Sequence, residues 1–270
     1  MEYETIKVEK RGAVDWLTLN RPESLNAISL RMVHELGDYF EKLFNDRSVR
    51  IVVMRGAGRA FSAGLDIKER DMRGEGAEQP PFGAGFGFQG YLAEVYIRMR
   101  RCPQPIIALV HGPACGGGFA FALASDIRLA GESARMNAAF IRIGLSACDM
   151  GTSYFLPRLV GVSVASELML TGRFIHAQRA LAVGLVSEVV PDDQLEAAAQ
   201  PYLDEMLTTS PMGLRLTKEG LNMAVDATSL QGAMAIENRN QVLVSTTKDA
   251  AEGRRDSRRR HAERGAGTRS

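Results

Sequence analysis

The sequence predicts an α/β fold in which short buried strands alternate with helices and a helical segment closes the chain. Apolar, β-branched runs of strand length recur at residues 14–19, 51–54, 106–110 and 186–190. Helical spacing of apolar residues lies between these runs, and from residue 194 onward it is the only pattern. We therefore expect a core over 1–192, a helical oligomerisation region over 193–252 and a disordered arginine-rich tail over 253–270.

The core is expected to begin with a hairpin and a capped helix. Residues 5–10 and 14–19 both alternate polar and apolar side chains, and Arg11-Gly12 between them suits a turn. Ser29 stands where an N-cap is needed, directly before a run with helical spacing. These patterns place two paired strands and one long helix ahead of the strand at 51–54.

A glycine-rich stretch with interleaved phenylalanines interrupts the core at residues 72–90. Such a composition does not favour one rigid shape. We expect a mobile loop whose phenylalanines cover an apolar pocket, followed by a helix over 91–101.

The second half of the core centres on residues 106–130. A buried strand there breaks at His111, and the glycine triplet at 116–118 opens an alanine-rich segment of helix length. This junction presents free backbone N–H groups, and glycine lets a ligand oxygen approach the main chain closely. Ala63-Gly64, after an earlier strand, is a second small-residue turn with another N–H to offer. Each turn by itself is equally consistent with a tight turn that only serves packing.

The spacing of apolar residues in the remainder of the chain predicts a loop and several helices, besides the strand at 186–190. The loop covers residues 144–151. The helices are expected at 153–160, 164–170, 177–183, 194–207, 214–224 and 230–244.

Composition narrows the class of protein. Hydrophobic residues make up 45% and charged residues 24% of the chain, as in ordinary globular proteins. We find no apolar run that could span a bilayer and no signal segment, so a cytoplasmic location is expected. The three cysteines, Cys102, Cys115 and Cys148, lack metal-ligand spacing, so neither a zinc site nor a disulfide framework is predicted.

The net charge of +1 hides a basic tail. Residues 253–270 carry a local balance of +5, which leaves −4 on the rest of the chain. A mildly acidic body argues against nucleic acid as the main ligand. RNA binding through the arginine tail is therefore only a minor alternative.

Two turns with exposed amides suit a thioester that becomes an enolate, because paired N–H groups stabilise the charge that develops on its oxygen. Several motifs extend this pattern in order over residues 1–252. They are Asn20-Arg21-Pro22, Leu25-Asn26-Ala27, the run FSAGLDIKE at 61–69, His111-Gly112 with Gly116-Gly117-Gly118, Ser125-Asp126-Ile127, Leu170-Thr171-Gly172, Ala177-Gln178 and AVGLV at 182–186. With these motifs the sequence resembles the crotonase (enoyl-CoA hydratase/isomerase) superfamily.

The resemblance implies a crotonase-like spiral of ββα units with two near-perpendicular sheets, and C-terminal helices that build a homotrimer or a dimer of trimers. It also implies an acyl-CoA substrate, with coenzyme A as part of the substrate and no separate cofactor. The N–H groups of Ala63 and Gly117 would form the oxyanion hole. The residues that would line the CoA are Ala63, Gly64, Leu65, Asp66 and Lys68.

The chain departs from the family pattern at the catalytic acids. Hydratases of the family carry one Glu two residues after the glycine triplet and another twenty residues beyond, where Ala120 and Phe140 stand here. Neither side chain can transfer a proton, so ordinary two-glutamate hydration is not expected. Asp149 lies in an Asp-x-Gly-Thr context similar to that of dienoyl-CoA isomerases. It is equally placed to cap the helix that begins near Thr152.

These observations lead to one function and one main alternative. We expect enolate chemistry on an acyl-CoA with Asp149 as the acid/base, and isomerisation favoured over hydration. The alternative is a catalytically silent acyl-CoA-binding homologue. Asp66 and Asp126 are expected to stabilise loops, and His111 to be a hydrogen-bonded structural histidine.

Overall fold

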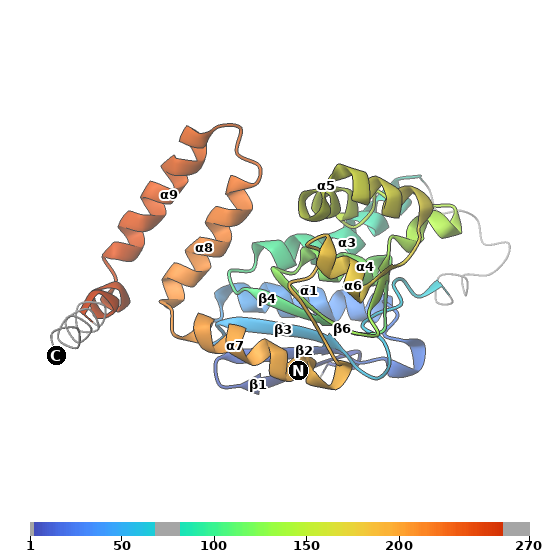
Figure 1. Cartoon of the computed structure of the whole chain (residues 1–270), viewed down its shortest axis with the longest axis horizontal. Coiled ribbons are helices and arrows are strands. Elements are labelled where there is room, and N and C mark those ends of the chain that lie inside the picture. The colour runs from blue at the N-terminus through green and yellow to red at the C-terminus, as the bar shows by residue number, and fades with distance from the viewer. Residues whose placement is uncertain (1–2, 68–81, 256–270) are drawn as a thin grey trace. The chain divides into compact units, whose positions relative to one another are not determined.

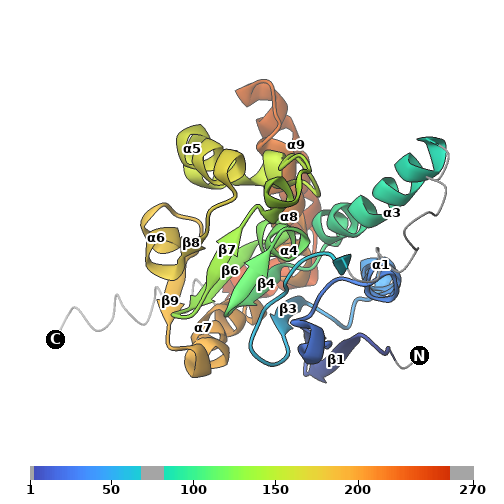
Figure 2. The same ribbon diagram turned by 90° about the vertical axis from the view of Figure 1, so that its right-hand side faces the viewer.

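A six-stranded sheet organises the first part of the chain (Figures 1 and 2). The computed structural model describes residues 3–67 and 82–255. The strand order is β1-β2-β3-β4-β6-β9, and all neighbours are parallel except the hairpin β1-β2. The strands are β1 (Ile6–Arg11), β2 (Val14–Leu19), β3 (Ile51–Gly56), β4 (Ile106–Val110), β6 (Ile127–Gly131) and β9 (Glu188–Val190). The predicted hairpin and central strands are therefore confirmed.

A second, three-stranded sheet has the order β5-β7-β8. It consists of β5 (Pro113–Cys115), β7 (Arg135–Asn137) and β8 (Ile175–His176). Because β5 follows β4 after only a short break, the chain passes from one sheet to the other immediately before the glycine triplet. This crossing places the triplet at a junction between the two sheets.

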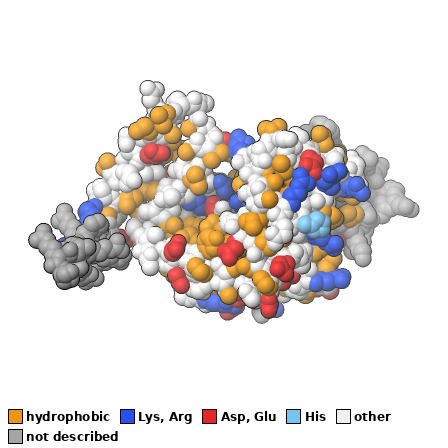
Figure 3. Space-filling model, in the orientation of Figure 1, with side chains coloured by type: hydrophobic (Ala, Val, Ile, Leu, Met, Phe, Trp, Pro, Cys, Tyr) orange, Lys and Arg blue, Asp and Glu red, His pale blue; other side chains and the backbone are white. Residues whose placement is uncertain are grey.

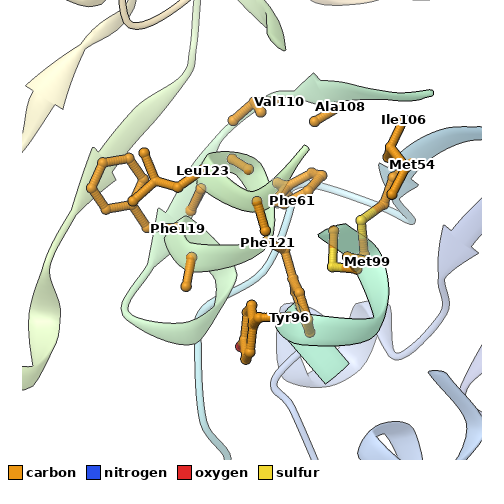
Figure 4. Close-up of a cluster of buried hydrophobic side chains, with 14 of the residues drawn as sticks. Met54, Phe61, Tyr96, Met99, Ile106, Ala108, Val110, Phe119, Phe121 and Leu123 are labelled. Atoms are coloured by element: carbon orange, nitrogen blue, oxygen red, sulfur yellow. The ribbon is translucent and has the colours of Figure 1, made fainter. Parts of the chain in front are cut away.

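Helices α1 (Leu30–Asn45), α3 (Phe82–Arg101) and α4 (Gly117–Ala124) pack on the large sheet. The side chain of Ser29 accepts a hydrogen bond from the Met32 amide at 3.1 Å, which confirms the predicted N-cap of α1. Every residue of α4 is buried. A helix that is apolar on all sides is stable only inside the core. Figure 4 shows Phe119, Phe121 and Leu123 of α4 in one buried cluster with Met54 of β3, Val110 of β4 and Tyr96 of α3.

The structure corrects the predicted end of the glycine-rich loop. Residues 82–90 belong to α3, so this helix begins nine residues before its predicted start. Phe88, Leu92 and Tyr96 pack on the core from this helix, and such tertiary contact outweighs the low helix propensity of glycine. The rest of the predicted loop, through residue 81, lies mostly outside the described residues, and its mobility stays a prediction.

The chain from residue 139 to 190 continues around the second sheet. It forms the 3₁₀ turn Ala139–Ile143, α5 (Thr152–Thr171) and α6 (Ala177–Ala182) before β9. The two helices predicted within 153–170 are the two halves of α5, which breaks at Gly161 with φ 77° and ψ 159°. Gly172 ends α5 in the left-handed conformation, as its position in the sequence predicts.

Two compact units divide the chain, Met1–Leu203 and Asp204–Ser270. Helix α7 (Leu195–Leu207) spans the division, and α8 (Pro211–Ala224) packs against α9 (Leu230–Ser245) within the second unit. Residues 248–255 are helical, and the remainder of the predicted tail lies outside the described residues. None of the described helices has the length and apolarity that a bilayer crossing requires.

Candidate active site

The two predicted glycine turns meet in space. Ser62 pairs with β5, because its amide donates to Pro113 O at 3.1 Å and its carbonyl accepts from the Cys115 amide at 2.9 Å. A Cβ placed on Gly64 would lie 2.6 Å from Cys115 O, and one on Gly118 would collide with Ser62 O. The absence of a side chain at both glycines is therefore what lets the turn at 62–66 approach the start of α4.

A buried asparagine holds the first of these turns in place. Asn26 is fully buried and adopts a left-handed backbone with φ 54°. Its side-chain amide donates to Ala57 O and Ala60 O at 2.8 Å each, while its Oδ1 accepts from the Arg21 amide at 2.9 Å. The Asn26 carbonyl also accepts from the Ser62 hydroxyl at 2.8 Å. These bonds satisfy the buried polar groups of the turn and fix its path.

Most backbone amides of the turn at 62–66 already donate a hydrogen bond within the protein. The Ala63 amide donates to Leu25 O at 2.9 Å, so this N–H is not available to a ligand. This finding corrects the prediction that Ala63 supplies an oxyanion donor. The Gly64 and Asp66 amides are engaged as well, by Ser62 Oγ and Ile28 O.

The Leu65 amide is the exception. Among the described residues no acceptor receives this N–H. Ile28 donates to Gly64 O and accepts from the Asp66 amide, which are the bonds on either side of Leu65. Since successive groups of an extended chain point in opposite directions, the Leu65 N–H faces away from Ile28.

Gly117 provides the second available donor. It is the first residue of α4, where helical N–H groups have no intrahelical partner, and within the described part of the chain its amide meets no acceptor. A Cβ on Gly117 would lie 2.8 Å from Ile28 Cδ1 and 3.0 Å from both Met150 Sδ and the Tyr96 hydroxyl oxygen. A Cβ on Gly64 would lie 3.5 Å from the Gly117 nitrogen, so the two turns present their amides close together.

The surroundings of these two amides are apolar at Ala120 and Phe140, the positions singled out in the sequence. Ala120 is completely buried inside α4. Phe140 is 5% exposed, and its ring lies 3.5 Å from a Cβ placed on Gly116. The space beside the glycine triplet is therefore occupied by hydrocarbon at both positions.

Asp149 is half-buried beside this region. Burial raises the pKa of Asp149 above its ordinary 3.8, while hydrogen bonds from the Met150 amide and the Gln89 side chain partly oppose the rise. The Asp149 side chain does not cap α5, whose N-cap is Gly151 without any side-chain bond. Met150 and Gly151 both have positive φ, 48° and 80°, and this turn directs the Asp149 carboxylate to Met150. The capping alternative is therefore wrong.

The other acids and the histidine singled out in the sequence have structural roles. Asp66 accepts from Arg21 at 2.9 Å, and Asp126 accepts from the Ile106 amide at 2.8 Å. The His111 ring Nε2 lies 2.8 Å from Gly58 O. These contacts confirm that the two acids stabilise loops and that His111 is hydrogen-bonded. Lys68 lies outside the described residues.

Comparison with known proteins identifies the family of this chain. The family model for enoyl-CoA hydratase/isomerase matches residues 9–266. The chain belongs to this family. A probable enoyl-CoA hydratase of Mycobacterium bovis is 42% identical over 236 residues, which cover 87% of this chain and 82% of the relative. The 1,2-epoxyphenylacetyl-CoA isomerase of Escherichia coli is 33% identical over 253 residues, or 94% of each chain.

A solved structure of the family shares the fold. The crystal structure of enoyl-CoA hydratase from Bacillus anthracis matches with a TM-score of 0.88 and 31% identity, over 95% of this chain and 97% of that chain. The crotonase fold class is thereby confirmed for this enoyl-CoA hydratase/isomerase family protein.

A cleft separate from these turns lies at the carboxyl ends of the parallel strands in this family member. It has a volume of about 1390 Å³ and is lined by charged residues of both signs, among them Arg55, Glu132 and Asp192. Neither Gly117 nor Asp149 lines it. Within the described residues no group of His, Cys, Asp and Glu side chains could hold a metal ion.

Sequence reasoning missed two contributors to the site, Leu65 as a donor and Tyr96 as a neighbour of Gly117. The sequence assigns Leu65 only to CoA lining, because the direction of its amide depends on pairing with Ile28. Tyr96 is one aromatic residue among several on an amphipathic helix, and nothing in its spacing distinguishes it from core.

Proposed function

We propose that this protein binds an acyl-CoA thioester and stabilises its enolate with the backbone N–H groups of Leu65 and Gly117. The observation that carries this proposal is a pair of amides for which the described residues offer no acceptor, on two turns that lie in direct contact. Two N–H groups aimed at one oxygen stabilise the charge that forms when the carbon next to the thioester carbonyl loses a proton. Ala63, Gly64, Leu65, Asp66 and Lys68 remain the residues proposed to line the CoA.

We further propose that Asp149 carries the proton. Its carboxylate takes a proton from one carbon of an unsaturated acyl chain, the electron pair moves into the enolate, and the same carboxyl returns the proton to a different carbon. The double bond shifts and no other reactant is consumed. The raised pKa of the half-buried Asp149 makes its carboxyl a stronger base than an exposed aspartate, which suits this transfer.

The apolar positions favour isomerisation over hydration. Water addition requires a group that aligns and activates water as well as one that protonates carbon. Ala120 and Phe140 offer no such group, and their hydrocarbon surfaces disfavour an ordered water. Because Ala120 and Phe140 offer no such group, they also support the alternative, a homologue that binds acyl-CoA without turnover.

A panel of enoyl- and dienoyl-CoA esters tests the proposal. Product analysis should show double-bond migration faster than hydration of crotonyl-CoA. Asp149→Asn should lower the turnover number by about 10²–10⁴ with little change in stability, because this side chain caps no helix. Asp193→Asn makes the same chemical change at an exposed acid and serves as the matched control. Equal activity of the Asp149→Asn variant would remove Asp149 from the mechanism.

The panel also separates the alternative. If the wild type binds the esters in calorimetry yet turns none of them over, the silent acyl-CoA-binding role replaces the enzymatic one. If it neither binds nor converts them, both roles are rejected.

We also propose that the second unit assembles a homotrimer or a dimer of trimers. Its helices expose large apolar side chains, with Leu221 62%, Leu230 76% and Val242 66% exposed. Figure 3 shows hydrophobic side chains on the surface over α8 and α9. Contiguous exposed apolar surface on a helix pair supports a subunit contact. Sedimentation equilibrium should give three or six chains, and replacement of these three residues by Glu should lower that number.

A further inference from the structure

Tyr96 lies on α3 and contacts both halves of the proposed site. Its hydroxyl is 3.0 Å from Gly117 O and 3.1 Å from Met150 Sδ. Gly117 carries a proposed oxyanion donor, and Met150 directly follows Asp149 in the chain. The Tyr96 side chain is 4% exposed, so these contacts are shielded from bulk water.

The ring and the hydroxyl of Tyr96 cover one turn of α4. The ring stacks on Phe121 with centroids 4.8 Å apart and an interplanar angle of 22°. Gly117 and Phe121 are four residues apart and therefore lie on the same face of the helix. Figure 4 shows the Tyr96 and Phe121 side chains next to each other below α4. The stack fixes where the hydroxyl lies, and the hydroxyl bonds the backbone of the first turn.

The hydroxyl is a permanent donor. Burial, reinforced by the charge of Asp149, raises the pKa of Tyr96 well above its usual 10, so the hydroxyl stays protonated. Its proton goes to Gly117 O, a stronger acceptor than a thioether sulfur. In the helix this carbonyl also accepts from the residue four positions ahead, and the second bond restrains the Gly117 unit further.

We propose that Tyr96 is a positioning residue for the enolate site, holding Gly117 from its carbonyl side so that its N–H points at the thioester oxygen. This inference rests on the proposed function. The bond from Tyr96 does not touch the ligand, so its loss misdirects the Gly117 N–H without removing it. The consequence falls on the charged enolate more than on the neutral thioester, because only the enolate depends strongly on donor alignment.

Acetoacetyl-CoA allows this to be measured without knowledge of the natural substrate. It binds as a thioester and its enolate absorbs in the near ultraviolet, so a titration at fixed pH reports the fraction of enolate on the protein. In Tyr96→Phe the ring and its stack on Phe121 remain and only the hydroxyl is lost. We expect the enolate-to-ketone ratio of the bound probe to fall about fivefold, as for loss of one hydrogen bond. Total binding of the probe, followed by calorimetry, should change much less.

Tyr39→Phe is the matched control. Tyr39 is also buried and donates to Asp15 at 3.1 Å, in a part of the core that contains neither glycine turn. This variant should lose stability in thermal melts but keep the wild-type enolate ratio. Replacement of Tyr96 by 3-fluorotyrosine keeps the ring and makes the hydroxyl a stronger donor, so it should raise the ratio.

The outcomes separate the inference from the function on which it rests. A wild type that binds the probe without any enolate signal overturns the oxyanion site itself, and the role of Tyr96 with it. A wild-type signal that is unchanged in folded Tyr96→Phe overturns only the positioning role. If Tyr96→Phe does not fold, an unchanged ratio in the fluorotyrosine protein overturns the positioning role instead.

Discussion

The half of the proposed site around Gly117 is made of main chain, whereas the half around Asp149 depends on one side chain. On the first side, Asn26, Ser62 and β5 hold the turns through buried hydrogen bonds, and the donors are amides. On the second side, Asp149 sits half-buried on a turn with two positive-φ residues and bonds the exposed Gln89. The first half consists of hydrogen-bonded backbone, and the second depends on the position and protonation state of one carboxylate.

This difference separates the two requirements of the proposed reaction, which are stabilisation of the enolate and transfer of a proton. Backbone donors place few demands on neighbouring side chains beyond glycine at points of close approach, so enolate stabilisation tolerates substitution around it. Proton transfer demands a titratable group at one place. Ala120 and Phe140 alter the second requirement without disturbing the first.

Among changes to the backbone donors, the largest effect is expected from Gly117→Pro. Proline suits the first position of a helix but lacks the N–H, so the variant should lose about 2.7–4 kcal/mol of transition-state stabilisation, or about 10²–10³ in turnover number. Steady-state kinetics on a confirmed substrate measures this, with circular dichroism to verify the fold. Gly117→Ala keeps the N–H and adds a Cβ near Ile28, Met150 and the Tyr96 hydroxyl. Equal losses in both variants would attribute the effect to crowding.

An amide-to-ester substitution separates Leu65 from Ala63. Replacing one N–H by an ester oxygen at Leu65 should lower turnover by about tenfold or more, because a donor to the enolate is lost. The same change at Ala63 breaks the bond to Leu25 O and should lower thermal stability by about 1 kcal/mol with a smaller kinetic effect. If the ester at Ala63 impairs turnover more than the ester at Leu65, the donor assignment is reversed.

The smallest effect is expected from loss of the hydrogen bond between Gln89 and Asp149. Asp149 must be ionised to accept a proton, so activity should fall as the pH drops through its pKa. Gln89→Leu removes a hydrogen bond that favours the ionised form, and the pKa of Asp149 should rise further. The acid limb of the kcat/KM profile is therefore expected at higher pH in the variant than in the wild type. A limb at the same pH would show that Gln89 does not influence the reactive carboxyl.

Local signals in the sequence predicted much of the fold correctly. Ser29 before α1 and Gly172 after α5 act through bonds or dihedral angles within a few residues, so their roles can be read from the chain itself. Strands β3 and β4 were predicted from apolar β-branched runs for the same reason, whereas β6 was not predicted. The start of α3 was not, because contacts with distant elements stabilise glycine-rich residues 82–90 as helix.

At the proposed site, the sequence by itself indicated which segments come together but not which of their atoms are available to a ligand. Small residues at 63–64 and 116–118 marked two turns with amides to offer, and the Asp-x-Gly-Thr run marked the acid. Tertiary structure decided that Leu65 rather than Ala63 keeps an N–H with no acceptor among the described residues, because Leu25 O accepts from the Ala63 amide while Ile28 pairs on either side of Leu65. It also decided that Tyr96 meets Gly117, since helix packing sets that contact. A hydrogen bond depends on direction as well as distance, and direction between segments far apart in sequence exists only after the chain has folded.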